Sequence, residues 1–240
     1  MPALRGCAGT RFRSVDTPRD GRGVALAADA IDLLDALGLD RVAVVGHDWG
    51  ARAAYTLAAL VPERVSAIVT LALAYQPRGV FEMPRFQQAR MFWYQWLMYS
   101  EAGMQAVRDD PLGFARIQWD TWSPPGWFDD EEFRETARSL RNPDWVAITL
   151  NAYRSRFLEH EPRDARYAQL ASRLAGLEQI SIPTLMIQGG DDRCDEPAGS
   201  SDQERFFTGG YRRVVLEGVG HFPHREAPEQ VSTAIEQHLR

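Results

Sequence analysis

The segment from residue 44 to residue 51, V-V-G-H-D-W-G-A, constrains the fold of this chain more than any other. It begins as a short β-branched run, which is typical of a strand buried in a parallel sheet. It continues, after two glycines, as an alanine-rich segment with helical character. One carboxylate, that of Asp48, lies between the glycines. A strand that runs through a tight turn into a helix indicates an α/β fold.

The same alternation recurs on both sides of this segment. We predict strands at residues 41–45, a short β-branched segment, at residues 65–73, an apolar segment, and at residues 183–188 and 211–216. Helical periodicity predicts helices at residues 25–39, 49–60, 199–207 and 226–239. Strands and helices joined by short connections predict a mostly parallel sheet with flanking helices.

The character of the sequence changes between residues 76 and 179. This stretch is aromatic, charged and helical in its patterning, and it contains no clear strand. The strand–helix alternation then returns. We therefore predict a helical cap at 76–179 that is inserted into a core formed by residues 1–75 and 180–240.

Composition narrows the class of function. The 240 residues carry a net charge of −6, without the basic patch that nucleic-acid binding needs. No apolar run reaches the roughly 18 residues of a membrane span. Two distant cysteines, Cys7 and Cys194, do not make a disulfide framework, and Asp16 and Asp20 argue against a transit peptide at the arginine-rich start. We expect a cytoplasmic protein whose partner is a small molecule.

The turn around Asp48 fits the nucleophile elbow, in which a strained residue between small neighbours carries the nucleophile. We expect glycine at both flanks, Gly46 and Gly50, because a Cβ there would clash. The electropositive N-terminus of the next helix would stabilise an anion at this point. The alternative is that Asp48 only caps that helix.

Two further residues complete a catalytic pattern. A carboxylate nucleophile forms an ester, whose hydrolysis needs a base and an acid that orients the base. Asp192 follows the strand at 183–188 and His221 follows the strand at 211–216, in the order nucleophile, acid, histidine. Each alone could be an ordinary turn or surface-loop residue. Together with Asp48 they predict a catalytic triad at the carboxyl edge of the sheet.

The chain resembles α/β-hydrolase-fold proteins of the epoxide hydrolase and haloalkane dehalogenase group. The resemblance rests on G-H-D-W-G-A around Asp48, on the segments before and after it, and on G-V-G-H-F-P-H-R-E-A-P around His221. It implies a hydrolase that acts at an sp³ carbon, with a helical cap inserted after the strand at 65–73 and with no cofactor or metal.

The resemblance extends to two cap segments. Trp93-Tyr94-Gln95-Trp96 and Leu150-Asn151-Ala152-Tyr153-Arg154 are similar to the epoxide hydrolase segments that carry the ring-opening tyrosines, with Ala152 in place of the usual tryptophan. It implies that Tyr94 and Tyr153 donate to the epoxide oxygen and that Trp93 and Trp96 contact the substrate. The alternative is that both tyrosines only pack in the cap, with their hydroxyls at the surface.

Trp49 is open to two interpretations. Its backbone N–H is expected to stabilise the oxyanion during ester hydrolysis. Its indole N–H could instead hold a halide, which is the dehalogenase alternative. The second halide donor would then be one of the cap tryptophans Trp93, Trp96, Trp119, Trp122 and Trp127.

The sequence departs from the family pattern at its start. No H-G-x-P motif, which supplies another oxyanion donor, precedes Asp48, and residues 2–12 resemble the end of the family's fourth strand. With the earlier strands missing, the strand at 41–45 is expected to form an exposed apolar edge. A truncated reading frame, a fragment, or a short form whose edge a second subunit covers in a homodimer would each explain this. A catalytically impaired, ligand-binding member of the fold is therefore a second alternative.

Overall fold

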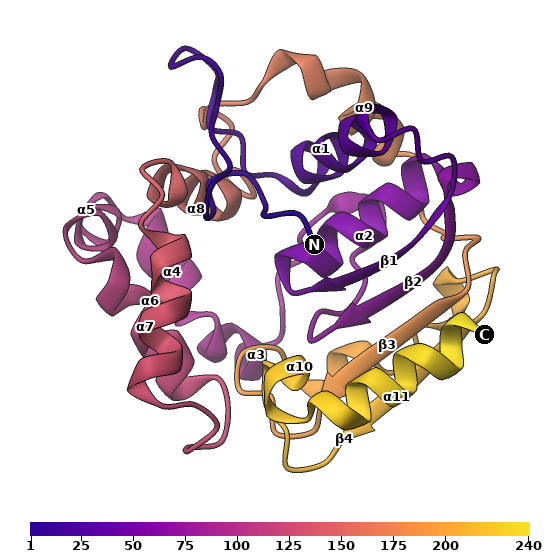
Figure 1. Ribbon diagram of the computed structural model, residues 1–240. Coiled ribbons are helices and arrows are strands. Elements are labelled where there is room, and N and C mark those ends of the chain that lie inside the picture. Colours follow the sequence, from indigo (N-terminus) through magenta and orange to yellow (C-terminus); the bar gives the residue numbers. More distant parts are fainter.

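A four-stranded parallel sheet forms the centre of the computed structural model, which describes residues 1–240 (Figure 1). The strands, which lie side by side in chain order, are β1 (Val42–His47), β2 (Val65–Leu71), β3 (Thr184–Gly189) and β4 (Tyr211–Leu216). All neighbours are parallel, with Val45 paired to Val69 and Ile187 to Val214. The four carboxyl ends therefore meet at one edge of the sheet. All four predicted strands form, with ends that differ by one or two residues.

Helices account for most of the remaining chain. The α-helices are α1 (Gly23–Ala36), α2 (Trp49–Leu60), α3 (Phe86–Met91), α4 (Trp93–Tyr99), α5 (Glu101–Asp109), α6 (Pro111–Thr121), α7 (Asp130–Leu140), α8 (Trp145–Arg154), α9 (Ala168–Leu174), α10 (Pro223–Glu226) and α11 (Pro228–Leu239). Short 3-10 turns are η1 (Pro62–Arg64), η2 (Pro77–Gly79), η3 (Ala165–Tyr167), η4 (Pro197–Ser200) and η5 (Glu204–Phe206). No helix is both long enough and apolar enough to cross a membrane.

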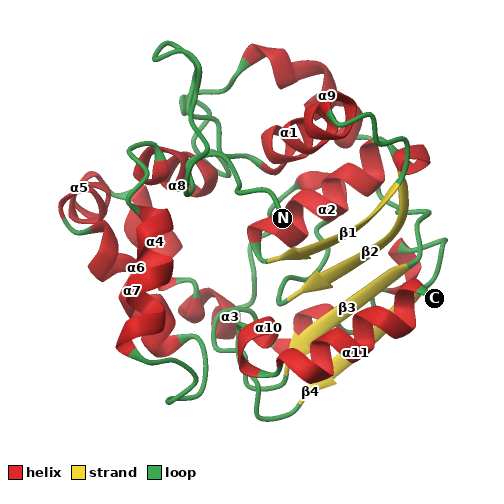
Figure 2. Cartoon of the chain, in the orientation of Figure 1, coloured by secondary structure: helices red, strands yellow, loops and turns green.

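Helices cover both faces of the sheet (Figure 2). Side chains alternate along a strand, so neighbours on β2 enter different cores. Ile68 joins the apolar cluster formed with α1 and α2, whereas Val69 joins the cluster formed with Val231 of α11. Burial on both faces explains why the strands have continuous apolar runs.

Residues 76–179 contain only helices, turns and loops. Helices α4 to α8 gather beside the carboxyl ends of the strands (Figure 1). Helices α4, α5, α6 and α8 share an apolar cluster that includes Tyr94, Met98 and Tyr153, and Trp49 and Phe222 from the sheet region pack against it. Helix α9 packs differently, because Leu174 belongs to the core formed with α1 and α2. The last helix of the predicted cap range thus lies on the sheet core.

Two predicted helices are wrong in detail. Residues 199–207 form parts of η4 and η5 in place of one helix, because Asp202 lies between them with φ of 56°, in the left-handed region. The predicted helix at 226–239 is broken at Ala227, whose φ of −139° and ψ of 55° are not helical. Ala227 precedes Pro228, and the proline ring disfavours the helical conformation for the residue before it.

The outer side of β1 has no neighbouring strand. Ala43 is exposed and Val45 is 49% exposed, although both lie in a strand of apolar residues. The predicted exposed apolar edge is therefore present in this structure.

Candidate active site

Asp48 lies in a strained turn between β1 and α2. Its φ of 48° and ψ of −110° are unusual for a residue with a side chain, and its N–H donates to the carbonyl oxygen of Leu71 over 3.1 Å. Its carboxylate makes no capping hydrogen bond to α2. The capping-only interpretation is therefore wrong, and the side chain is left available to a ligand.

The two glycines of the elbow are not equivalent. A Cβ on Gly46 would lie 2.2 Å from the carbonyl oxygen of Gly50, which is far inside van der Waals contact. A Cβ on Gly50 would meet no atom within 4 Å. The expectation that both glycines are sterically required is thus wrong for Gly50, whose side-chain direction is open.

Asp192 and His221 form a buried pair behind the elbow. His221 Nδ1 lies 2.9 Å from Asp192 Oδ2, and the two side chains are 1% and 0% exposed. Asp192 Oδ1 accepts from the N–H groups of Cys194 (2.8 Å) and Asp195 (2.9 Å), and Oδ2 accepts from Gln188 Nε2. Neither residue is an ordinary surface residue, and the acid is fixed by three donors in addition to the imidazole.

The charge of His221 depends on the carboxylates around it. Burial alone would lower the pKa of this imidazole, but Asp192, with smaller contributions from Asp48 and Asp195, raises that pKa to about 9. Since Nδ1 is engaged by Asp192, the other nitrogen, Nε2, is the reactive one. It is buried and has no hydrogen-bond partner in the protein.

Three polar side chains hold the loop of His221. His47 Nε2–H donates to the His221 carbonyl oxygen over 2.7 Å, and burial with two neighbouring histidines lowers the pKa of His47, which keeps it neutral. The N–H of His221 donates to Ser123 Oγ over 2.8 Å, and Ser123 donates to Glu226 Oε1 over 2.7 Å. Ser123 comes from the helical insertion, so this contact ties the cap to the catalytic loop.

The two predicted tyrosines meet beside Asp48. Their rings are nearly perpendicular, at 88° with centroids 5.4 Å apart, and both line the same cavity as Asp48 and His221. Tyr153 Oη accepts from Trp49 Nε1 over 3.0 Å, and Tyr94 Oη accepts from Gln95 Nε2 over 3.1 Å. Burial raises the pKa of both phenols, so both remain protonated. Both residues are buried, so their hydroxyls do not lie at the surface.

The tryptophans take different positions. Trp49 begins α2, so its backbone N–H has no acceptor within the helix. Trp96 Nε1 donates to the carbonyl oxygen of Ala89 over 2.6 Å, and Trp93 is 39% exposed. Neither tryptophan lines the cavity that contains Asp48, so their contact with the substrate stays a prediction. Trp122 Nε1 is buried without a partner, and its ring lies 4.9 Å from that of His221.

Two arginines in this cavity were missed from the sequence. The cavity has a volume of about 20 Å³ and is lined by Asp48, Arg52, Leu73, Gln76, Phe81, Phe92, Tyr94, Gln95, Tyr153, Arg156, Cys194, Asp195 and His221. Arg52 lies four residues after Asp48, and Arg156 three after Tyr153. Each arginine is thus within one helical turn of a predicted site residue, at the start of α2 or just past the end of α8, and this proximity could have indicated both arginines.

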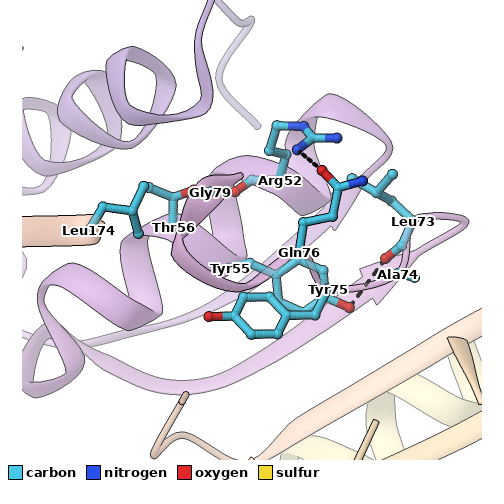
Figure 3. A pocket seen from close by; sticks show the side chains of 9 residues that line it. All are labelled: Arg52, Tyr55, Thr56, Leu73, Ala74, Tyr75, Gln76, Gly79 and Leu174. Atoms are coloured by element: carbon cyan, nitrogen blue, oxygen red, sulfur yellow. Dashed lines mark hydrogen bonds between the residues drawn. The ribbon is translucent and has the colours of Figure 1, made fainter. Parts of the chain in front are cut away.

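Each of these arginines hydrogen-bonds to a glutamine. Arg52 Nη1 donates to Gln76 Oε1 over 2.7 Å (Figure 3), and Arg156 Nη1 donates to Gln95 Oε1 over 2.7 Å. Gln95 in turn donates to Tyr94, so Arg156 helps to position that phenol. No group of three or more His, Cys, Asp or Glu side chains is arranged to hold a metal ion.

Comparison with known proteins decides the family. Residues 1–228 match the family described as the alpha/beta hydrolase fold. The chain belongs to the α/β hydrolase fold family. This membership confirms the predicted fold class, in which helices flank a parallel sheet.

Several similar α/β hydrolases are described as epoxide hydrolases. Epoxide hydrolase A of Mycobacterium tuberculosis is 26% identical over 249 residues, which cover 89% of this chain and 73% of that protein. Epoxide hydrolase 3 of Siraitia grosvenorii is 25% identical, covering 98% of this chain and 80% of that protein. A crystal structure from Klebsiella pneumoniae, provisionally described as an epoxide hydrolase, has 38% identity and a TM-score of 0.89. It matches 98% of this chain and 78% of its own. The protein is thus an α/β hydrolase similar to epoxide hydrolases.

Proposed function

We propose that this protein is an epoxide hydrolase that converts an epoxide to a diol through an ester on Asp48. One observation supports this proposal above the others. Asp48, Tyr94, Tyr153 and His221 all line a single cavity. A nucleophile, two acids and a base are the groups that the two half-reactions need.

In the first step, a carboxylate oxygen of Asp48 attacks one epoxide carbon and the bond from that carbon to the ring oxygen breaks. The ring oxygen takes a proton from a phenol. Tyr153 is suited to donate, because its oxygen accepts from Trp49 Nε1 and its own proton makes no hydrogen bond within the protein. Tyr94 stabilises the developing alkoxide from the other segment of the cap.

In the second step, His221 takes a proton from water, which attacks the ester carbonyl of Asp48. Ester formation removes the negative charge of Asp48, which is one of the causes that raise the pKa of His221. The imidazole therefore becomes easier to deprotonate when its role as a base begins. The oxyanion lies at the N-terminus of α2, where the backbone N–H of Trp49 can donate.

Dehalogenation with the same triad is a second candidate. It is favoured by the partnerless Nε1 of Trp122, which is close to His221 and could bind a halide. The indole N–H of Trp49, the other donor that this reaction would use, is engaged by Tyr153. Epoxide opening is compatible with the hydrogen bond from Trp49 to Tyr153, and we therefore prefer epoxide hydrolysis to dehalogenation.

The test is diol release from terminal and aryl epoxides, with Asp48→Asn as the control and chloride or bromide release from haloalkanes as the comparison. A single turnover in ¹⁸O-labelled water then separates the mechanisms. Through the ester, the first diol is unlabelled because its new oxygen comes from Asp48. Labelled diol in the first turnover would rule out the ester. Folded protein that releases neither diol nor halide would favour the catalytically impaired alternative.

A further inference from the structure

The site contains two cations whose charge has no direct role in the proposed reaction. Arg52 and Arg156 line the cavity of Asp48, but each hydrogen-bonds to a glutamine where a carboxylate would be the usual partner. Buried arginines elsewhere in the protein do form ion pairs, as Arg5 does with Asp29 and Arg154 with Glu161. The pairing of Arg52 and Arg156 with neutral amides leaves their positive charge uncompensated by a direct contact.

The arrangement of these two side chains is energetically costly in the absence of an anion. Arg52 Nε is buried without a hydrogen-bond partner, and an unpartnered buried donor costs about 1–3 kcal/mol. Burial, together with the neighbouring Arg156, lowers the pKa of Arg52 to about 10. The indole of Trp49 keeps both groups at the cavity, since the two Cζ atoms lie 5.1 Å and 5.3 Å from its ring centroid.

We propose that the substrate carries a carboxylate, which binds to Arg52 and Arg156 while Asp48 attacks the adjacent epoxide. This inference rests on the proposed function. A guanidinium presents planar N–H donors that match the two oxygens of a carboxylate, and Nε of Arg52 is the donor left free. The cavity encloses only about 20 Å³ in this structure, so we choose the shortest oxirane carboxylate as the probe.

The chemistry balances without a further reactant. Asp48 forms a C–O bond to the oxirane, the ring C–O bond breaks and the ring oxygen takes a phenol proton. Water then hydrolyses the ester, which restores the carboxylate of Asp48, and the proton that His221 takes from water returns to the phenolate. The product is a dihydroxy carboxylate. The competing explanation is that Arg52 and Arg156 only balance the charges of Asp48 and Asp195. In that case, their loss would affect all substrates alike.

The test compares glycidate with glycidamide, which have nearly the same shape but differ in charge. We expect the kcat/KM of the wild type to be about tenfold or more higher on glycidate than on glycidamide. Arg52→Gln should lower kcat/KM on glycidate by roughly ten- to hundredfold and change kcat/KM on glycidamide little. Arg52→Lys should restore part of the preference, because it keeps the charge but loses the planar donors. The control substitution is Arg212→Gln. Arg212 is exposed and also donates to a glutamine, so this substitution should leave kcat/KM on both substrates unchanged. Equal losses on both epoxides, or a wild-type preference for the amide, would overturn the proposal.

A binding measurement separates this proposal from the epoxide hydrolase assignment. Cyclopropanecarboxylate has the shape of glycidate but no epoxide, and calorimetry should show that it binds the wild type, binds Arg52→Gln more weakly, and competes with glycidate. Cyclopropanecarboxamide should bind neither protein measurably. If the carboxylate binds through Arg52 but no epoxide is opened, the anion site stands and the reaction is wrong. If neutral aryl epoxides are hydrolysed and the carboxylate does not bind, the hydrolase stands and the anion site is wrong.

Discussion

At the scale of single residues, the site depends on the conformation of Asp48. A residue with a side chain at φ of 48° costs about 1–3 kcal/mol, so the surrounding structure must hold it there. Gly46 makes this possible, because any Cβ at that position would collide with the backbone of Gly50. As a consequence of this conformation, the carboxylate of Asp48 makes no capping hydrogen bond to α2, and Asp48 lines the same cavity as His221.

The two elbow glycines should therefore respond differently to alanine. We expect Gly46→Ala to lower the free energy of unfolding by about 2–3 kcal/mol or more, because the elbow backbone must move. Gly50→Ala should raise it by about 0.5–1 kcal/mol, since alanine favours the helix and its Cβ meets nothing. Urea denaturation of both variants measures this difference. Equal destabilisation by the two substitutions would contradict the steric argument.

The pH dependence should follow His221. Only the neutral imidazole can take a proton from water, so ester hydrolysis should slow by about tenfold for each pH unit below the pKa of His221 in the ester. The covalent intermediate should then accumulate at low pH, which mass spectrometry of acid-quenched samples can quantify.

Asp192→Asn provides the matched variant for this pH profile. It removes the carboxylate that raises the pKa of His221. The ascending limb of the profile should therefore move to lower pH, while the plateau rate falls because the imidazole is less well oriented. A limb at the same pH in both proteins would mean that another group controls it.

At the scale of elements, β3 is the most buried part of the sheet, since all six of its residues are buried. Its position between β2 and β4 places Ile187 in the cluster that packs on α11. β1 lies at the edge and shows the opposite pattern, with Val45 49% exposed. The stability of the sheet therefore resides in its inner strands, although Asp48 directly follows the edge strand.

Truncation of a β3 side chain should accordingly cost much more than truncation on β1. Ile187→Ala should lower the free energy of unfolding by about 2–5 kcal/mol, because it removes packed methyl groups and leaves a cavity. Val45→Ala should change it by about 0.5 kcal/mol or less, as at other exposed positions. Thermal and urea unfolding at concentrations low enough for the protein to be monomeric give both values, and a loss at Val45 as large as that at Ile187 would mean that Val45 is packed within the monomer.

At the scale of the whole molecule, the sheet ends in an unpaired strand with exposed apolar residues. Such an edge exposes backbone donors and acceptors that can pair with another chain. The cap lies beside the carboxyl ends of the strands and does not cover this side of β1 (Figure 1). We propose that a second copy covers this edge in a homodimer.

Concentration-dependent self-association tests this proposal. Sedimentation velocity should show larger species as the protein concentration rises, and Val45→Lys should shift the distribution towards monomer, because an edge lysine disfavours strand pairing. The stability of the monomer should be unchanged, since Val45 is exposed. A wild-type protein that remains monomeric throughout the concentration range would contradict the proposal.

Local patterning in the sequence determined much of this architecture. Short segments between turns indicated all four strands, β1 and β2 by their β-branched or apolar residues. The periodic apolar residues of α1 indicated that helix, because burial on a face repeats at a fixed spacing. The elbow at Asp48 and the residues Asp192 and His221 each follow a strand, and parallel strands bring their carboxyl ends to one edge. The sequence therefore determined the fold class and the meeting of these three side chains.

Tertiary structure alone decided the remaining features of the site. The contact of Ser123 with His221 joins residues 98 positions apart, and no local pattern encodes such a contact. The partners of Arg52 and Arg156 depend likewise on how the cap sits on the sheet, because whether a guanidinium is ion-paired is settled by distant neighbours. Asp202 stops a helix through its own left-handed conformation, which apolar periodicity does not reveal. Chain order thus set which groups reach the sheet edge, and packing set the charge and shape of the cavity that they share.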